Sequence, residues 1–295
     1  MDISDLKVLE SVSRLGSMNR AAQELHTVQS NVTARIRSLE EELGVELFLR
    51  HARGVSTTAA AQRLLPFAGR IMSLLAEAQA AARDDGTPSG SLVLGGLETT
   101  TALRLSPILS HFAKTYPAVR LVIATGTTHK LLDDVLGYRL EGAFVAGPVD
   151  HPDLHRETVF REELVLVTPP AIRTPDDLAH VPDLKTIVFQ IGCSYRQRLE
   201  SLLAERGIVT ARPLEFGSLD TIVSCVAAGV GVTLLPKGVV AKARREGRIA
   251  IHELPSKQAQ VDTLFVRRAD AYVSSAMSAF LDIARSDPGK FAASG

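Results

Sequence analysis

The spacing of apolar residues changes part-way along this chain of 295 residues, and that change constrains the fold more than any other feature. Up to residue 83 the apolar residues recur every three or four positions, the period of an amphipathic helix. From residue 91 short apolar runs alternate with helical segments, which is typical of an α/β domain with mostly parallel strands. Residues 84–90 between them are Asp, Gly, Thr, Pro and Ser, a linker composition. The sequence therefore predicts a helical domain followed by an α/β domain.

Residues 3–43 predict three consecutive helices. Gly16 ends the first and Ser17 can cap the second. In the third, apolar residues spaced three or four apart form one narrow stripe, namely Val28, Val32, Ile36, Leu39 and Leu43. Two short strands, 45–48 and 54–57, follow around a turn. This order is that of a winged helix-turn-helix, whose second motif helix enters the major groove of DNA.

Short hydrogen-bonding side chains gather at the start of the third helix, opposite its apolar stripe. A recognition helix enters the groove with its first turn. Ser, Asn and Thr at a helix start also serve as ordinary caps. The chain has 33 Lys+Arg and 33 Asp+Glu, yet residues 50–70 hold four arginines and no acidic residue. This uneven distribution favours a DNA-binding head within a chain of zero net charge.

Residues 59–83 predict one long, alanine-rich helix. Its apolar residues repeat every seven positions, at 64, 71 and 78 and again at 68, 75 and 82. Such a seam buries little by itself, but it can pack closely against a second copy. The alternative is a helix that lies on its own α/β domain.

Residues 1–66 resemble the winged helix-turn-helix of LysR-type transcriptional regulators. The matching positions are Leu6, Leu9, Val12, Gly16, Ser17, Ala21, Ala22, Leu25, Gln29, Ser30, the run 36–44, Leu47, Phe48, Arg50, Thr57 and Thr58. The rest of the chain resembles the effector domain of this family, which is similar to a type 2 periplasmic binding protein with two lobes. The resemblance implies a winged helix-turn-helix at 1–58, a dimerisation helix and hinge at 59–90, and an effector domain at 91–295. In that domain it implies lobe I at 91–161 and 267–295, and lobe II at 162–266.

The resemblance also implies which residues contact DNA. They are Ser17, Gln29, Ser30, Asn31, Thr33, Arg35, Arg37, Arg50 and Arg53. Arg50 and Arg53 belong to the wing, and an arginine at its tip suits a narrow minor groove. One departure from the family is Ala34, which replaces a residue that commonly contacts the DNA backbone, so we expect Arg35 or Arg37 to take over that contact.

The partners implied by the resemblance are double-stranded DNA with an interrupted palindrome, a small effector, further copies of the chain and RNA polymerase. Two heads reading a palindrome need a two-fold arrangement, and family members are mostly homotetramers, although a homodimer remains possible. We expect no cofactor and no membrane contact.

Four segments of the α/β domain open helices after strands, where such folds bind ligands. The effector-binding candidates in these segments are Thr99, Thr100, Thr101, Thr127, Thr128, Gly192, Cys193, Ser194 and Phe216. Hydroxyls and backbone N–H groups at a helix start favour an anion, so an anionic effector is expected. The same residues can be simple caps. Cys193 is interpreted as a thiol in this cleft rather than as half of a disulfide with Cys225, which reads as a small core residue.

The sequence offers no motif of a catalytic or metal site. It lacks a nucleophile elbow, a Walker loop and a dinucleotide-binding glycine motif. His151 and His155 are four apart, but Pro152 argues against the helix that would place them together. The missing motifs predict a protein that is not an enzyme. An acidic N-terminus, two cysteines and no apolar run long enough to span a bilayer predict a cytoplasmic location. The alternative is a solute-binding or enzymatic α/β protein whose helical N-terminus does not bind DNA.

Overall fold

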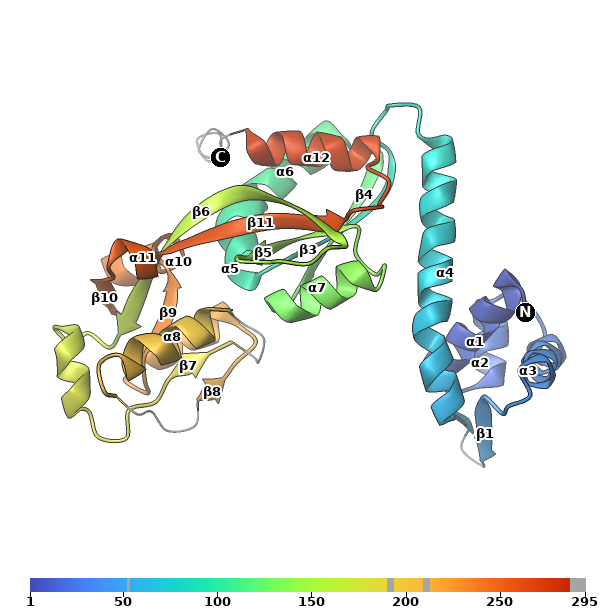
Figure 1. Ribbon diagram of the computed structural model, residues 1–295, viewed down its shortest axis with the longest axis horizontal. Helices are drawn as coiled ribbons and strands as arrows, with labels where there is room; N and C mark the ends of the chain where they lie inside the picture. The colour runs from blue at the N-terminus through green and yellow to red at the C-terminus, as the bar shows by residue number, and fades with distance from the viewer. Residues whose placement is uncertain (52–53, 190–193, 209–212, 287–295) are drawn as a thin grey trace. The chain divides into compact units, whose positions relative to one another are not determined.

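The computed structural model describes residues 1–51, 54–189, 194–208 and 213–286. The chain forms two compact units, one of Met1–Arg83 with Gly137–Arg139, the other of the remaining residues from Asp84 onward (Figure 1). Within the described residues, no helix is both long enough and apolar enough to cross a bilayer.

The first unit has the elements that the sequence predicts. In chain order they are α1 (Ile3–Leu15), α2 (Met18–Glu24), α3 (Gln29–Leu43), β1 (Phe48–His51), β2 (Gly54–Thr57) and α4 (Ala59–Arg83). Asp2 and Asp5 form a capping box at the start of α1. Gly16 ends that helix in the left-handed conformation, at φ 62°.

The stripe of α3 forms the centre of this unit's core. Val32, Ile36 and Leu39 are at most 1% exposed and pack with Leu9 and Val12 of α1. Complete burial of each such side chain stabilises the fold by about 1.5–3 kcal/mol. The two ends of the predicted stripe were wrong, since Val28 is 65% exposed and Leu43 is 38% exposed. Val28 precedes the helix as its N-cap residue.

The first wing strand begins later than predicted, at Phe48 rather than at residue 45. A carboxylate oxygen of Glu40 on α3 accepts hydrogen bonds from the backbone N–H groups of Leu47 (2.7 Å) and Phe48 (3.1 Å), so a side chain holds the chain that enters the strand. β1 and β2 then pair antiparallel, with His51 opposite Gly54. Gly54 (φ 137°) lies so close to α1 that an added Cβ would be 2.5 Å from the carbonyl oxygen of Gly16.

Helix α4 has the predicted bounds, but its exposed apolar face differs from the predicted seam. Ala68 is fully buried and Leu64 packs partly against the core of the head. Phe67, Ile71 and Leu74 are 59%, 42% and 52% exposed and share one face at spacings of four and three. Of the predicted seam at 64, 71 and 78, Ile71 and Ala78 are exposed, whereas Leu64 is partly covered by the head.

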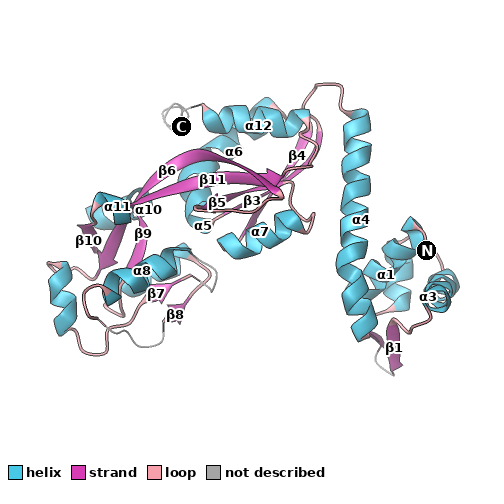
Figure 2. Cartoon of the chain, viewed as in Figure 1, coloured by secondary structure: helices cyan, strands magenta, loops and turns pink. Residues whose placement is uncertain are grey.

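The second unit alternates strands and helices in two lobes (Figure 2). The first elements of this unit belong to the first lobe. They are β3 (Gly90–Gly96), α5 (Glu98–Thr100), a π-helix (Thr101–Leu105), α6 (Ser106–Thr115), β4 (Val119–Thr125), α7 (Thr128–Leu136) and β5 (Gly142–Ala146). The elements that follow are β6 (Leu154–Thr168), a 3₁₀-helix (Pro175–His180), β7 (Ile187–Val188), α8 (Ser194–Ala204), β8 (Leu214–Glu215), α9 (Leu219–Ala227), β9 (Thr233–Pro236), α10 (Lys237–Arg245), β10 (Ala250–Glu253), α11 (Ser256–Ala259), β11 (Gln260–Arg268) and α12 (Ser275–Arg285).

The main sheet has the strand order β10-β6-β11-β5-β3-β4, with β9 also paired to β6. Strand β3 is parallel to β4 and β5, whereas β11 is antiparallel to both β5 and β6, and β6 is antiparallel to β9 and β10. The prediction of mostly parallel strands was therefore wrong for this sheet. The antiparallel pairs come from β6 and β11, which run side by side between the two lobes (Figure 1).

Alternating residues of the first-lobe strands pack against helices on both faces. On one face Phe144 and Phe265 (ring centroids 5.0 Å apart) join Phe112 of α6 and Phe280 of α12. On the other face, Ala143 and Val145 pack in the cluster that includes α7. The late strand β11 returns to the first lobe, where it pairs with β5.

Candidate DNA-binding face and effector pocket

The polar face of α3 is fixed by the buried stripe behind it. Gln29, Ser30, Asn31 and Arg37 are exposed, while Thr33 is half-buried. Asn31 Nδ2 donates a hydrogen bond to Thr27 Oγ1 (3.0 Å), which orients this side chain at the start of the helix. The N-cap residue Val28 makes no side-chain capping bond, so the cap leaves the first N–H groups of α3 to other acceptors, such as a phosphate.

The two candidate arginines of α3 have different surroundings. Arg35 Nη1 lies 2.8 Å from Asp5 Oδ1 and 3.6 Å from Asp2 Oδ1, so Arg35 ties α3 to the start of α1. Arg37 is exposed, and it makes no ion pair with the residues that the structure describes. Of the two, Arg37 is thus better placed to take over the contact that Ala34 cannot make.

The remaining head candidates lie at a cap and on the wing. Ser17 is the N-cap of α2, and its Oγ accepts a hydrogen bond from the backbone N–H of Arg20 (3.4 Å). Arg50 is exposed on β1, opposite Val55. Arg53 lies outside the described residues. Glu40, which no sequence pattern singled out, fixes the wing relative to α3 through its bonds to the backbone at the start of β1.

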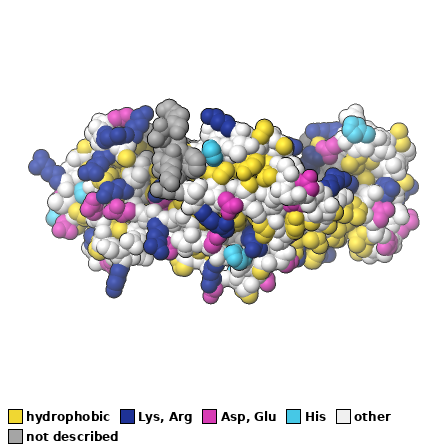
Figure 3. All heavy atoms as spheres, turned by 90° about the horizontal axis from the view of Figure 1, so that it is seen from above, with side chains coloured by type: hydrophobic (Ala, Val, Ile, Leu, Met, Phe, Trp, Pro, Cys, Tyr) yellow, Lys and Arg dark blue, Asp and Glu magenta, His cyan; other side chains and the backbone are white. Residues whose placement is uncertain are grey.

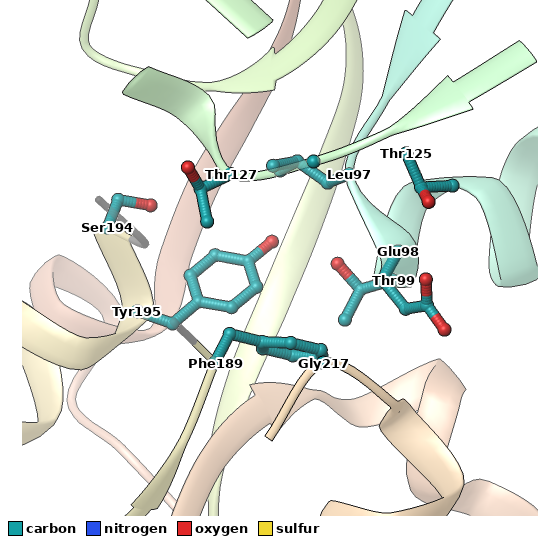
Figure 4. Close-up of a pocket in the computed structure, with 10 residues that line it drawn as sticks. Leu97, Glu98, Thr99, Thr125, Thr127, Phe189, Ser194, Tyr195 and Gly217 are labelled. Carbon is teal, nitrogen blue, oxygen red and sulfur yellow. The ribbon is translucent and has the colours of Figure 1, made fainter. Parts of the chain in front are cut away.

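A pocket of about 140 Å³ lies between the two lobes of the second unit (Figure 4). Its lining comes from the segments that follow β3, β4, β7 and β8, and consists of Leu97, Glu98, Thr99, Thr125, Gly126, Thr127, Phe189, Ser194, Tyr195 and Gly217. Because β3 is parallel to β4 and β7 is parallel to β8, the carboxyl ends of both strand pairs open into it.

Three of the predicted effector residues line this pocket, namely Thr99, Thr127 and Ser194. Gly192 and Cys193 lie outside the described residues. The other four predicted residues, Thr100, Thr101, Thr128 and Phe216, are not among its lining. Successive helical residues point about 100° apart, so one turn cannot present every hydroxyl to the same cavity.

Those four residues have contacts elsewhere. Thr100 is buried in the fold at 3% exposure, and Thr101 opens the π-helix beside Gly96. Thr128 Oγ1 accepts a hydrogen bond from the backbone N–H of Ala146 (3.4 Å). Phe216 packs against the core of the second lobe. These four side chains thus lie outside the lining of this pocket, and their contact with an effector stays a prediction.

The pocket also has an apolar and aromatic lining, which the pattern of polar residues at helix starts did not predict. Tyr195 is 4% exposed, and its ring reaches from α8 toward Leu97 and Thr99 (Figure 4). Phe189 follows β7 and lies beside this ring. In the sequence they stand on either side of the candidates Gly192, Cys193 and Ser194, and this pair of aromatic residues was the available signal.

The electrostatics of the pocket are simple. Glu98 is the only charged side chain among the described lining residues. Ser194 Oγ is buried and has no hydrogen-bond partner among the residues that the structure describes. A buried hydroxyl without a partner costs free energy, which a ligand can recover by bonding to it.

An ion pair links the π-helix, which follows the pocket residues Glu98 and Thr99, to β6, which joins the lobes. Arg104 of the π-helix donates from Nε to Glu162 Oε1 (2.6 Å) and from Nη2 to Oε2 (3.0 Å). Glu162 is 7% exposed and lies on β6 just before that strand changes partner from β11 to β9. The guanidinium also lies 5.9 Å from the ring centroid of Phe160. π-Helical turns are frequent at functional sites.

Two family models together match almost the whole chain. The model "Bacterial regulatory helix-turn-helix protein, lysR family" matches residues 3–62, and "LysR substrate binding domain" matches residues 85–288. The chain belongs to the LysR family of transcriptional regulators. This membership agrees with a DNA-binding regulator that carries an effector-binding domain, and it disfavours the alternative of a solute-binding or enzymatic protein.

Curated LysR-family relatives are similar over nearly their full length. The transcriptional regulator GltR of Bacillus subtilis is 41% identical over 281 residues, which is 95% of each chain. The regulator SoxR of an Arthrobacter species is 39% identical over 288 residues, 98% of each chain.

Solved structures of full-length LysR-family regulators share this fold. CbnR complexed with its target DNA aligns with a TM-score of 0.69 at 23% identity, over 97% of this chain and 99% of that one. A full-length OxyR variant of Pseudomonas aeruginosa aligns with a TM-score of 0.68 at 20% identity, over 97% of this chain and 93% of that one. In the described part of this LysR-type chain, no group of three or more His, Cys, Asp or Glu side chains is placed to hold a metal ion.

Proposed function

We propose that this LysR-type regulator binds an interrupted palindromic operator through two heads and changes its promoter contacts when a small effector occupies the pocket between the lobes. The observation that carries the DNA-binding part is the exposed polar first turn of α3, opposite side chains that are at most 1% exposed. A helix fixed in this way presents hydrogen-bonding groups to base edges without having to reorganise.

In this proposal Gln29, Ser30, Asn31 and Thr33 read bases in the major groove, while Ser17 and Arg37 contact the backbone. Arg50 and Arg53 of the wing reach the adjacent minor groove. Arg35 acts through its bonds to α1 and positions α3 rather than touching DNA.

Dimerisation is supported by the exposed face of α4. Phe67, Ile71 and Leu74 leave apolar surface in water, which a second α4 would cover. We extend the proposed dimer to a homotetramer. Two of its heads bind the palindrome, and the other two can bind a neighbouring site. The promoter-bound protein would then contact RNA polymerase. The functional parts in this proposal are residues 1–58, 59–90 and 91–295.

The effector is proposed to hold both sides of the pocket at once, because the lining comes from both lobes. An anionic group on it would meet the Thr127 and Ser194 hydroxyls at the starts of α7 and α8. An effector shifts the regulator only if it binds one arrangement of the lobes better than the other.

The test of DNA binding is fluorescence anisotropy with a labelled fragment from upstream of the protein's own gene, at several salt concentrations. Arg37→Ala and Arg50→Ala should each weaken binding by about tenfold and reduce the slope of log affinity against log salt by about one. Arg120→Ala is the matched control, because Arg120 is exposed on β4 of the other unit (Figure 3 shows one face of the molecule with its Lys and Arg side chains in dark blue). Unchanged affinity and slope in both head variants would refute the assigned face.

A further inference from the structure

The ring of Tyr195 lies in the middle of the residues that line the effector pocket. In Figure 4 it stands between the Thr127 and Ser194 side chains on one side and the Thr99 side chain on the other. Tyr195 is 4% exposed, so the place that the ring takes is closed to water. A ligand that starts from the Thr127 and Ser194 hydroxyls therefore meets the tyrosine ring before it can reach the far side of the lining.

Packing from both lobes holds this ring in place. Tyr195 lies in the first turn of α8 and belongs to a buried cluster that also contains Leu199 of the same helix and Leu131 and Val145 of the first lobe. A buried aromatic side chain keeps about 150–250 Å² of surface out of water, so turning the ring outward is strongly unfavourable. The ring is thus a fixed wall of the pocket.

The space that remains beside the ring is small. The pocket has a volume of about 140 Å³, and an engineered apolar cavity of about 150 Å³ in another protein binds benzene. An effector that is confined to this space therefore has about the size of benzene. Removing the phenol group of Tyr195 would add the space of one further ring.

We propose that Tyr195 is the specificity-determining residue of this pocket, because its ring limits the effector to a metabolite of about the size of benzene and excludes ligands with a further ring. This inference rests on the proposed effector function of the pocket. It adds the size class of the ligand and the residue that sets it. Tyr195→Ala leaves the Thr127 and Ser194 hydroxyls in the chain and should open the space behind them.

The test uses the purified full-length protein and isothermal titration calorimetry with 4-hydroxyphenylacetate. This probe carries a carboxylate for the Thr127 and Ser194 hydroxyls and the same phenol group that Tyr195→Ala removes. Tyr195→Ala should bind the probe about ten- to a hundredfold more tightly than the unsubstituted protein, the value of burying one aromatic side chain. Acetate, which has the carboxylate without the ring, should show no such gain.

Leu199→Ala is the matched control. Leu199 is fully buried on the same helix, about one turn after Tyr195, and it does not line the pocket. Its truncation also leaves a cavity in the core, but this variant should gain no binding of the probe. Tyr195→Val keeps a branched apolar side chain in the cluster and should show the same gain as Tyr195→Ala. It takes the place of that variant if circular dichroism shows that the alanine variant does not fold.

The outcomes separate this inference from the proposed function. Equal affinity of the probe for the unsubstituted protein and the folded Tyr195 variants overturns the inference and leaves the proposed effector function standing. An equal gain in Leu199→Ala also overturns it, because any cavity in the core would then accept the ring. Adding Thr127→Val and Ser194→Ala to Tyr195→Ala should abolish the gain. A gain that survives this pair supports the size limit and overturns the proposed position of the anionic group.

Discussion

The ion pair between Arg104 and Glu162 should contribute strongly to the stability of the effector-binding unit. Removing one partner of a buried pair costs about 3–5 kcal/mol, because the other charge is left without compensation. Glu162 is 7% exposed, but Arg104 is 33% exposed, so water replaces part of the lost interaction. We expect Arg104→Met, which keeps the length of the side chain, to lower the free energy of unfolding by about 2–3 kcal/mol.

Thermal unfolding followed by circular dichroism measures this loss. A domain of this size loses about 2–4 °C in Tm for each kcal/mol, so Arg104→Met should lower the Tm of the unit by about 4–12 °C. The matched control is Arg285→Met. Arg285 also makes two bonds to one carboxylate, that of Glu157 at 2.9 Å, but its side chain is 50% exposed. Exposed pairs contribute about 0–1 kcal/mol, so this control should change Tm little.

A second substitution tests the stated cause. Glu162→Leu in the Arg104→Met background removes the unpaired carboxylate and should recover part of the lost stability, as expected when the penalty comes from buried charge. If Arg104→Met is no more destabilising than Arg285→Met, or if Glu162→Leu makes the double variant still less stable, the reasoning from burial is refuted.

Three further predictions concern other sites. Gly54→Ala should destabilise the head by about 1–3 kcal/mol, measured by urea unfolding, because φ is 137° and the new Cβ would lie 2.5 Å from Gly16 O. Burial lowers the pKa of His252, whose Nε2 lies 2.9 Å from Thr168 Oγ1. The contribution of the neutral imidazole to stability should therefore fall as the pH drops through about 6.5, and His252→Asn should weaken that pH dependence. The pKa of Asp84 is lowered to about 2, and the largest cause is the hydrogen bond from the backbone N–H of Ser275. The stabilisation by this carboxylate should therefore persist above pH 3.8 and disappear as the pH falls toward 2, and the Asp84→Asn variant should lack this pH dependence.

The head could be predicted from the sequence almost completely, because local signals determine it. The spacing of Val32, Ile36 and Leu39 gave the buried face of α3, and Gly16 gave the end of α1. The bounds of α4 were also predicted correctly. The start of β1 was missed because a carboxylate eight residues earlier, that of Glu40, sets it.

The sheet was harder to predict because β6, the strand that pairs with β11, β9 and β10, does not have a strand pattern along its whole length. The continuous apolar run covers only residues 164–167, whereas β6 begins ten residues earlier, at Leu154. That first part contains His155, Arg156, Glu157, Arg161 and Glu162, and long-range pairing with β11 overrides this polar composition.

In the pocket, sequence reasoning identified the right segments but not the right side chains. The segments follow strands, and the order of strands and helices gives their position. Whether Thr99 or Thr100 faces the cavity depends on the rotation of a helix whose next residues form a π-turn. Tyr195 was missed because an aromatic residue in a helix is usually interpreted as a core residue. At 4% exposure it does belong to the core, and it also lines the pocket.

The paired strands β6 and β11 limit how the two lobes can move. Because the polypeptide passes between the lobes twice, on neighbouring hydrogen-bonded strands, one lobe cannot swivel freely about the other. The ladder resists sliding and in-plane bending, so out-of-plane flexing is the soft motion that remains. The register shift between Thr263 and Leu264 lies where β11 is also paired with β5, so the part of the strand pair that is free to flex is the part beyond it, toward the second lobe. A ligand that draws the lobes together therefore has to bend these two strands.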